Sequence, residues 1–153
     1  MMEAMGMIEQ PKEKRLEVIF PEENYIRAND LQGFLFYFNM YYMLFKSKSN
    51  TNKDIRVLLN QKEELRKSFR FTKKDYLNYS KEIYSDLNDL LIYEIEKHSP
   101  LEIIFGGSIV ALVSALILSG GTVEIDISKG VFKANIHQSL GKSLKELKSF
   151  LKD

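Results

Sequence analysis

The sequence predicts an α+β protein in which a small sheet packs on helices. Three observations predict this class: short β-type runs near both ends of the chain, a stretch of helical periodicity in the middle, and a long segment without charge at 103–123. Each run is apolar on one face or throughout, so the elements must cover one another in a common core. The 153 residues are the size of one domain. We expect a flexible tail at 1–14 and a single α+β domain at 15–153.

Composition limits the function classes. The apolar share of 44%, the charged share of 28% and the net charge of +1 are values of a globular protein and give no electrostatic reason to expect nucleic acid. Cysteine is absent, which excludes disulfides and thiolate chemistry and is compatible with a reducing compartment. The first dozen residues lack the basic start and apolar run of a secretory signal. We therefore expect a cytoplasmic protein, with a membrane location as the alternative.

The N-terminal third predicts a strand followed by an aromatic helix. Residues 16–20, LEVIF, are a β-type run that Pro21 ends. Asn24 or Asp30 can cap the next helix, which we expect to reach about Phe45. Its uncharged part would be about 22 Å long, shorter than the roughly 30 Å hydrocarbon core of a bilayer. We interpret it as a core or interface helix.

The middle of the chain predicts a second strand and an amphipathic helix. Residues 55–59, IRVLL, form a compact apolar run that we expect to be a strand, whereas 62–71 suits either a helix or a strand. Thr72 can cap a helix that continues to about residue 97. Its apolar face would consist of Tyr76, Tyr79, Ile83, Leu87, Leu90 and Leu91.

Residues 99–121, SPLEIIFGGSIVALVSALILSGG, predict an entirely apolar helix over 100–119. Ser99 and Glu102 have the spacing of a capping box, Pro100 suits the first helical position, and the glycines at 120 and 121 suit its end. Such a helix would be about 30 Å long, which is also the thickness of a bilayer. Length alone leaves burial and membrane insertion both open.

The C-terminal part predicts a hairpin and a short helix. With a two-residue loop at 129–130, one face pairs Ile127 with Phe132, Ile125 with Ala134 and Val123 with Ile136. Leu140, Leu144, Leu147 and Leu151 form a helical stripe below a solvated lysine face. The residues after 120 are too few to bury these faces alone across a membrane, which favours one core that includes the helix at 100–119.

The two apolar helices carry more apolar surface than one small fold would cover, which predicts a partner. Small residues at every fourth position of the helix at 100–119 would let another helix approach closely, and aromatic residues would extend the contact. The expected interface residues are Gly107, Ala111, Ala115, Ser119, Phe34, Phe38, Tyr41, Tyr42 and Phe45. The expected partner is a second copy of the chain or an effector protein, with contact to a membrane left open and nucleic acid not expected.

No motif predicts catalysis, a cofactor or a metal. His98 and His137 lack a metal-site spacing. The GGS at 106–108 lacks the lysine of a phosphate-binding loop and lies inside an apolar run. We therefore expect no catalytic, cofactor-binding or metal-binding residues.

Six segments carry a family resemblance: LEVIF at 16–20, IRVLL at 55–59, GGSIVALVSALILSGG at 106–121, TVEIDIS at 122–128, VFKANIH at 131–137 and SLKELKSFL at 143–151. Over roughly half of its length, the chain resembles the small effector-associated constant component proteins of bacterial conflict systems. The resemblance implies a non-catalytic adaptor that accompanies an effector enzyme in a defence locus. Our expectation is a non-enzymatic adaptor or oligomerisation module of a bacterial defence system. The alternative is a membrane-anchored or membrane-disrupting effector with 100–119 as its transmembrane helix.

Overall fold

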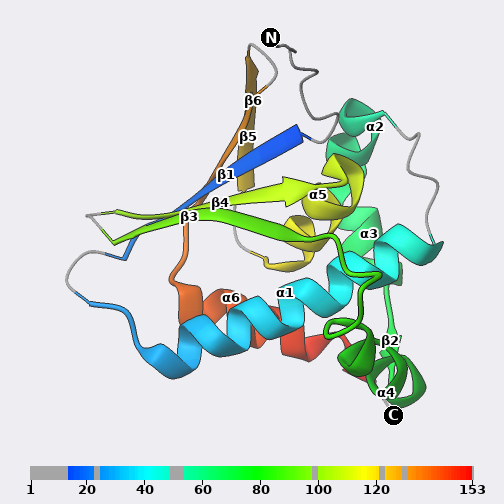
Figure 1. The fold of residues 1–153 in the computed structure, drawn as a ribbon. Coiled ribbons are helices and arrows are strands. Elements are labelled where there is room, and N and C mark those ends of the chain that lie inside the picture. The colour runs from blue at the N-terminus through cyan, green and yellow to red at the C-terminus, as the bar shows by residue number, and fades with distance from the viewer. Residues whose placement is uncertain are drawn as a thin grey trace, which may run out of the picture.

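The computed structural model describes residues 14–22, 25–48, 54–97, 100–120, 123–128 and 131–152. Its helices are α1 (Ala28–Lys48), α2 (Ile55–Asn60), α3 (Lys62–Ser68), α4 (Lys73–Glu82), α5 (Ile109–Leu118) and α6 (Leu140–Ser149). Its strands are β1 (Lys14–Phe20), β2 (Phe71–Thr72), β3 (Leu91–Lys97), β4 (Leu101–Gly107), β5 (Val123–Ser128), β6 (Val131–Ile136) and β7 (Leu151–Lys152). The expected α+β class is confirmed (Figure 1).

A five-stranded sheet of order β3-β4-β1-β6-β5 forms one layer. The expected N-terminal strand is confirmed as β1, at the centre of this sheet, where Val18 pairs antiparallel with Ile103 of β4 and parallel with Ala134 of β6. Lys14 already belongs to β1, whereas the rest of the expected tail, 1–13, lies outside the described residues.

The expected hairpin is confirmed in its register. β5 and β6 pair Ile127 with Phe132 and Val123 with Ile136, as the alternation of apolar residues predicts. The expected loop at 129–130 lies outside the described residues.

The central strands bury one face only. Buried side chains alternate along β1, β4 and β6 and lie against α1, α5 and α6: Leu16, Val18, Phe20, Leu101, Ile103, Phe105, Phe132, Ala134 and Ile136. On the other face, Arg15, Lys133 and Asn135 are exposed, and Glu17 and Glu102 are half-buried. α1 and α6 run beside each other below the sheet, and α1 also contacts α5 (Figure 1). The sheet thus has one face packed on helices and one open face.

The aromatic helix is confirmed as α1, although its start differs from the prediction. Asp30 lies within the first turn and not at the cap, and Asn24 lies outside the described residues. The helix is buried between the sheet and α6. Phe38 stacks on Phe105 of β4 with ring centroids 4.7 Å apart, and the buried Tyr41 hydroxyl donates to the Leu147 carbonyl oxygen of α6.

The prediction of one helix over 100–119 is wrong. Residues 101–107 form β4, which is paired on both sides, and the helix α5 begins only at Ile109. Gly107 has φ of 145°, a conformation that L side chains rarely adopt, and it separates the strand from the helix. Glu102 lies in β4 and cannot close a capping box; instead, the Ser108 hydroxyl accepts from the Ala111 N–H at the start of α5. The predicted end is confirmed at Gly120, where φ is 83°.

Two further predictions in the middle of the chain are wrong. Residues 55–59 lie in the helix α2, because Asp54 caps it through the Arg56 N–H. The amphipathic helix starts as predicted, with a capping box between Thr72 and Asp75, but it ends at Glu82. Residues 91–97 are the strand β3.

The apolar helix α5 is covered by the chain itself. One side faces the main core, and Val110, Val113 and Ile117 on another side form a second cluster with Leu58 of α2. Arg66 of α3 donates from Nε to the Ile117 carbonyl oxygen at 2.9 Å. The apolar surplus that the sequence indicated is therefore absorbed by α2 and α3. No helix in the described ranges combines the length and apolar character that a membrane crossing requires.

Candidate protein-interaction edge

Exposed apolar side chains concentrate in one segment, residues 84–95. Most of the large apolar side chains that are exposed in the described structure belong to it. The most exposed are Tyr84 at 82% and Leu87 at 70% of their reference area. The others are 39–44% exposed: Leu91, Ile92, Tyr93 and Ile95. Contiguous exposed apolar surface is typical of an interaction site, whereas single exposed apolar residues are ordinary.

Four of these residues belong to β3, an edge strand. β3 pairs antiparallel with β4, and no strand of the described structure pairs with its other side. Ile92 lies opposite Phe105, and Ile95 lies opposite Ile103. Directly paired residues share a face of the sheet, so both isoleucines extend the apolar face beyond the cover of the helices. An edge strand also presents unpaired backbone N–H and C=O groups that can pair with a strand of another chain.

Tyr93 occupies a bulge on the open face of the sheet. The register between β3 and β4 shifts between Ile92 and Glu94. The Tyr93 ring covers Gly106, where a Cβ would overlap it, and the Arg15 guanidinium carbon lies 4.0 Å from the ring centroid. This cation–π contact holds the bulged residue flat on the sheet.

Carboxylates gather on the open face beside the edge. Glu94 pairs with Ile104, Glu96 lies directly opposite Glu102, and Glu17 of β1 follows on the next strand. A hydrogen bond and charge repulsion from Glu96 raise the pKa of Glu94 above its ordinary value. Desolvation, followed by interactions with Glu17 and Glu94, raises the pKa of Glu102, although Lys133 opposes this shift. The cluster thus carries an excess of negative charge.

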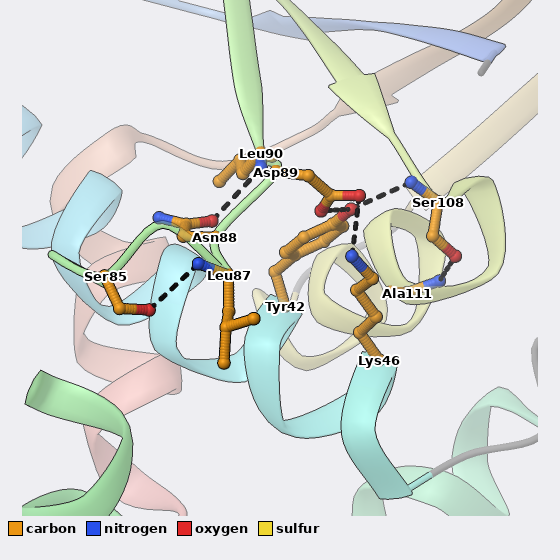
Figure 2. A network of polar contacts seen from close by, with 9 residues as sticks. All are labelled: Tyr42, Lys46, Ser85, Leu87, Asn88, Asp89, Leu90, Ser108 and Ala111. Atoms are coloured by element: carbon orange, nitrogen blue, oxygen red, sulfur yellow. Dashed lines mark hydrogen bonds and ion pairs between the residues drawn. The ribbon is translucent and has the colours of Figure 1, made fainter. Parts of the chain in front are cut away.

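A polar network fixes the segment that leads into β3. The buried Tyr42 hydroxyl donates to Asp89 Oδ1 at 2.7 Å and accepts from the Ser108 N–H at 2.9 Å (Figure 2). Lys46 Nζ lies 2.6 Å from Asp89 Oδ2. Burial alone would raise the pKa of Asp89, but the hydrogen bonds from Lys46 and Tyr42 outweigh it and lower that pKa. Asp89 is therefore held between α1 and the start of α5.

Local hydrogen bonds shape the turn before Asp89. The Asn88 side chain donates to the Ile83 carbonyl oxygen at 2.9 Å and accepts from the Leu90 N–H at 3.1 Å. The Ser85 hydroxyl accepts from the Leu87 N–H at 3.2 Å, and Leu87 projects away from this turn (Figure 2). Such bonds from Ser and Asn to nearby backbone are typical of turns that replace helix. These bonds hold the backbone of the turn that carries Leu87, whose side chain is largely exposed.

A small hollow adjoins Leu87. It has a volume of about 240 Å³ and is lined by Met43, Lys46, Ser47, Tyr79, Glu82 and Leu87. Ser47 Oγ and the Tyr79 hydroxyl are 2.7 Å apart, so these two polar groups already satisfy each other. The hollow is smaller than the usual 300–1,000 Å³ of a small-molecule site. In the described ranges, no group of three or more histidine or acidic residues is placed to hold a metal ion.

The residues predicted as an interface lie inside the fold. All nine are buried: Phe34, Phe38, Tyr41, Tyr42, Phe45, Gly107, Ala111, Ala115 and Ser119. Gly107 belongs to β4, so the predicted groove of small residues along one helix does not exist. Ala111 and Ala115 face the main core, and the Ser119 hydroxyl donates to the Ala115 carbonyl oxygen. As for the two histidines, His137 is exposed after β6, and His98 lies outside the described residues.

The edge strand itself was missed because a helical pattern was extended through it. Leu87, Leu90 and Leu91 happen to continue the helical spacing of the preceding residues. The run LIYEIEK contains the β-branched and aromatic residues that are typical of strands, and Asn88-Asp89 before it is a turn signal. That combination could have located β3.

Comparisons of the chain with protein-family models, with curated proteins and with solved structures found no match.

Proposed function

We propose that the chain is a non-enzymatic adaptor that binds a protein partner by strand addition at β3. The observation that carries the proposal is that Leu91, Ile92 and Ile95 are exposed on β3, an edge strand whose outer side pairs with no strand of the described structure; Leu87 and Tyr84, shortly before it in the chain, are exposed as well. In strand addition, backbone hydrogen bonds supply affinity, and alternate side chains supply specificity. β3 offers both.

The exposed area is sufficient for a useful affinity. Complete burial of the six exposed side chains in 84–95 would contribute on the order of 10–15 kcal/mol before the costs of association, at about 25 cal/mol per Å². Backbone hydrogen bonds along β3 add to this, and the loss of translational and rotational freedom opposes it. The polar network around Asp89 reduces the ordering cost, because the segment is already held in place.

The resemblance to constant component proteins of bacterial conflict systems supports an adaptor in preference to an enzyme. In that setting the partner is an effector protein, the role is antiviral defence, and the location is the cytoplasm. The absence of cysteine is compatible with that compartment. The proposal thus keeps the predicted class of function and moves its surface from the buried helices to the sheet edge.

A paired purification tests the proposal. The tagged chain, its Ile95→Asp variant and a Val57→Asp control are expressed in the source cells, and any protein that co-purifies is identified, produced separately and remixed. Val57 is comparably exposed at 48%, but it lies on α2, away from β3. We expect the remixed complex to survive Val57→Asp, to be lost with Ile95→Asp, and to slow amide exchange over 91–97.

The proposal is overturned if the reconstituted complex tolerates Ile95→Asp, or if amide protection arises elsewhere and not in β3. Circular dichroism of both variants checks that neither substitution unfolds the chain.

A further inference from the structure

Resting on the proposed function at β3, we infer that the occupant of this edge is a basic extended segment of another protein. Its side chains alternate between lysine or arginine on the open face of the sheet and aliphatic residues on the helix side. Three features of the edge carry this inference: its negative charge, the placement of its isoleucines, and the repulsion between carboxylates that a second copy of the chain would cause.

The charge of the edge selects a cationic neighbour. Glu94 and Glu96 share the open face of the outermost strand, and Glu102 lies directly opposite Glu96. Like charges that face each other across a sheet are destabilising. On this face the cations of the neighbouring strands are Arg15 of β1 and Lys133 of β6, the pairing partner of Glu17 and three strands from β3. Arg15 already lies over the Tyr93 ring. Cationic side chains on an added strand would therefore relieve a repulsion that the isolated chain retains.

The other face of the same strand selects aliphatic side chains. Ile92 and Ile95 continue the row of Phe105 and Ile103, but both are more than two-fifths exposed. Residues of an added strand that lie opposite them would fall on the helix side of the sheet. Because successive side chains of a strand alternate between faces, cations and aliphatic residues must also alternate in the occupant.

A second copy of the chain fits this edge poorly. Antiparallel pairing of β3 with β3 would bring Glu94 and Glu96 of both copies to one seam, next to the two Glu102 side chains. Charged residues and a bulge on an edge strand are a recognised means of preventing such self-pairing. Both are present here, since the register shifts at Ile92/Glu94. The same carboxylates that exclude a second copy would attract a basic strand.

The inference also predicts how binding depends on pH. The charged groups that share the open face with Glu94 are Glu96 on β3, Glu102 on β4, Arg15 and Glu17 on β1 and, beyond them, Lys133 on β6. A hydrogen bond and charge repulsion from Glu96 raise the pKa of Glu94, and a bound cation would lower it again. Binding therefore favours the deprotonated form and should weaken as pH falls through the raised pKa.

Capped heptapeptides that alternate valine with lysine, valine with serine or valine with glutamate are suitable probes. Each peptide is titrated into the intact chain at low ionic strength, with affinity from fluorescence anisotropy and location from amide exchange. The matched variants are Glu94→Gln with Glu96→Gln at the β3 edge, and Asp126→Asn, an exposed carboxylate on the opposite edge strand β5. We expect only the lysine peptide to bind well, with protection over 91–97 and clear weakening in high salt.

Loss of both edge carboxylates should weaken the lysine peptide by about fivefold to tenfold, as expected for two exposed charge pairs, whereas Asp126→Asn should change little. Equal binding of all three peptides at β3 would overturn the basic occupant and leave strand addition standing. Dimerisation of the chain through β3 would overturn it in favour of a second copy. If no peptide protects β3 and the reconstituted complex tolerates Ile95→Asp, both the inference and the proposed function fail.

Discussion

Tyr42→Phe removes one oxygen atom from the centre of the network that positions the interaction edge. The Tyr42 hydroxyl joins three elements, because it donates to Asp89 before β3 and accepts from the Ser108 N–H at the start of α5. The ring itself is buried in α1 and would keep its packing. The substitution therefore tests the hydrogen bonds and leaves the core largely unchanged.

The expected loss of stability is about 2 kcal/mol. A partly buried backbone N–H without a partner costs about 1–3 kcal/mol, and Ser108 is half-buried, so the lower half of that range applies. The lost bond to Asp89 adds less than about 1 kcal/mol, because that side chain is 51% exposed and keeps its contact with Lys46.

Urea unfolding measures this loss, and amide exchange of the native protein locates it. We expect faster exchange over 85–90 and at Ser108 in Tyr42→Phe. The matched control is Tyr41→Phe, which removes a buried hydroxyl that donates to the Leu147 carbonyl oxygen on the far side of α1. The control should lose stability without selective release of 85–90. A loss below about 0.5 kcal/mol for Tyr42→Phe, or the same exchange pattern in both variants, would refute this account of the network.

Two other substitutions test the packing of α5 and the charge at Asp89. Ala115→Leu should lower the free energy of unfolding by about 1–3 kcal/mol, because Ala115 is completely buried in the core. A variant that keeps its stability but changes its oligomeric state would contradict this and would support the interface that the sequence predicted on this helix. Since the pKa of Asp89 is lowered in the folded chain, its stabilising contribution is complete above the ordinary value of 3.8 and is lost as pH falls through the folded value. Urea midpoints measured across that range should therefore fall less in Asp89→Asn than in the original chain, and parallel curves would contradict the assignment.

The apolar segment 99–121 shows where sequence reasoning is reliable and where it fails. A fully buried strand and a fully buried helix are both continuous apolar runs, so periodicity cannot distinguish β4 from α5. The pair Gly106-Gly107 followed by Ser108 was the available signal, because a glycine at positive φ ends the strand and serine caps the next helix. Half-buried elements left a clearer pattern, which is why the register of β5 with β6 was predicted correctly.

The interaction edge could be predicted only in part. Isoleucine is usually a core residue, so the sequence predicts burial of Ile92 and Ile95. They are exposed because the helices do not cover the outermost strand. That boundary is a tertiary property that no local pattern contains. In the same way, the buried positions of Phe38 and Val113 depend on Phe105 of β4 and Leu58 of α2, which lie far from them in the sequence.

The central position of β1 has a consequence for how the chain acquires its fold. The two hairpins, β3 with β4 and β5 with β6, can each form from neighbouring residues, but the sheet joins them only through β1. During synthesis the residues of β1 emerge before the other strands; one of their edges must wait for the β3–β4 hairpin and the other for the β5–β6 hairpin. The contacts that close the sheet are therefore among the most distant along the chain, which predicts slow folding and a transient exposure of LEVIF to other strands or to a chaperone.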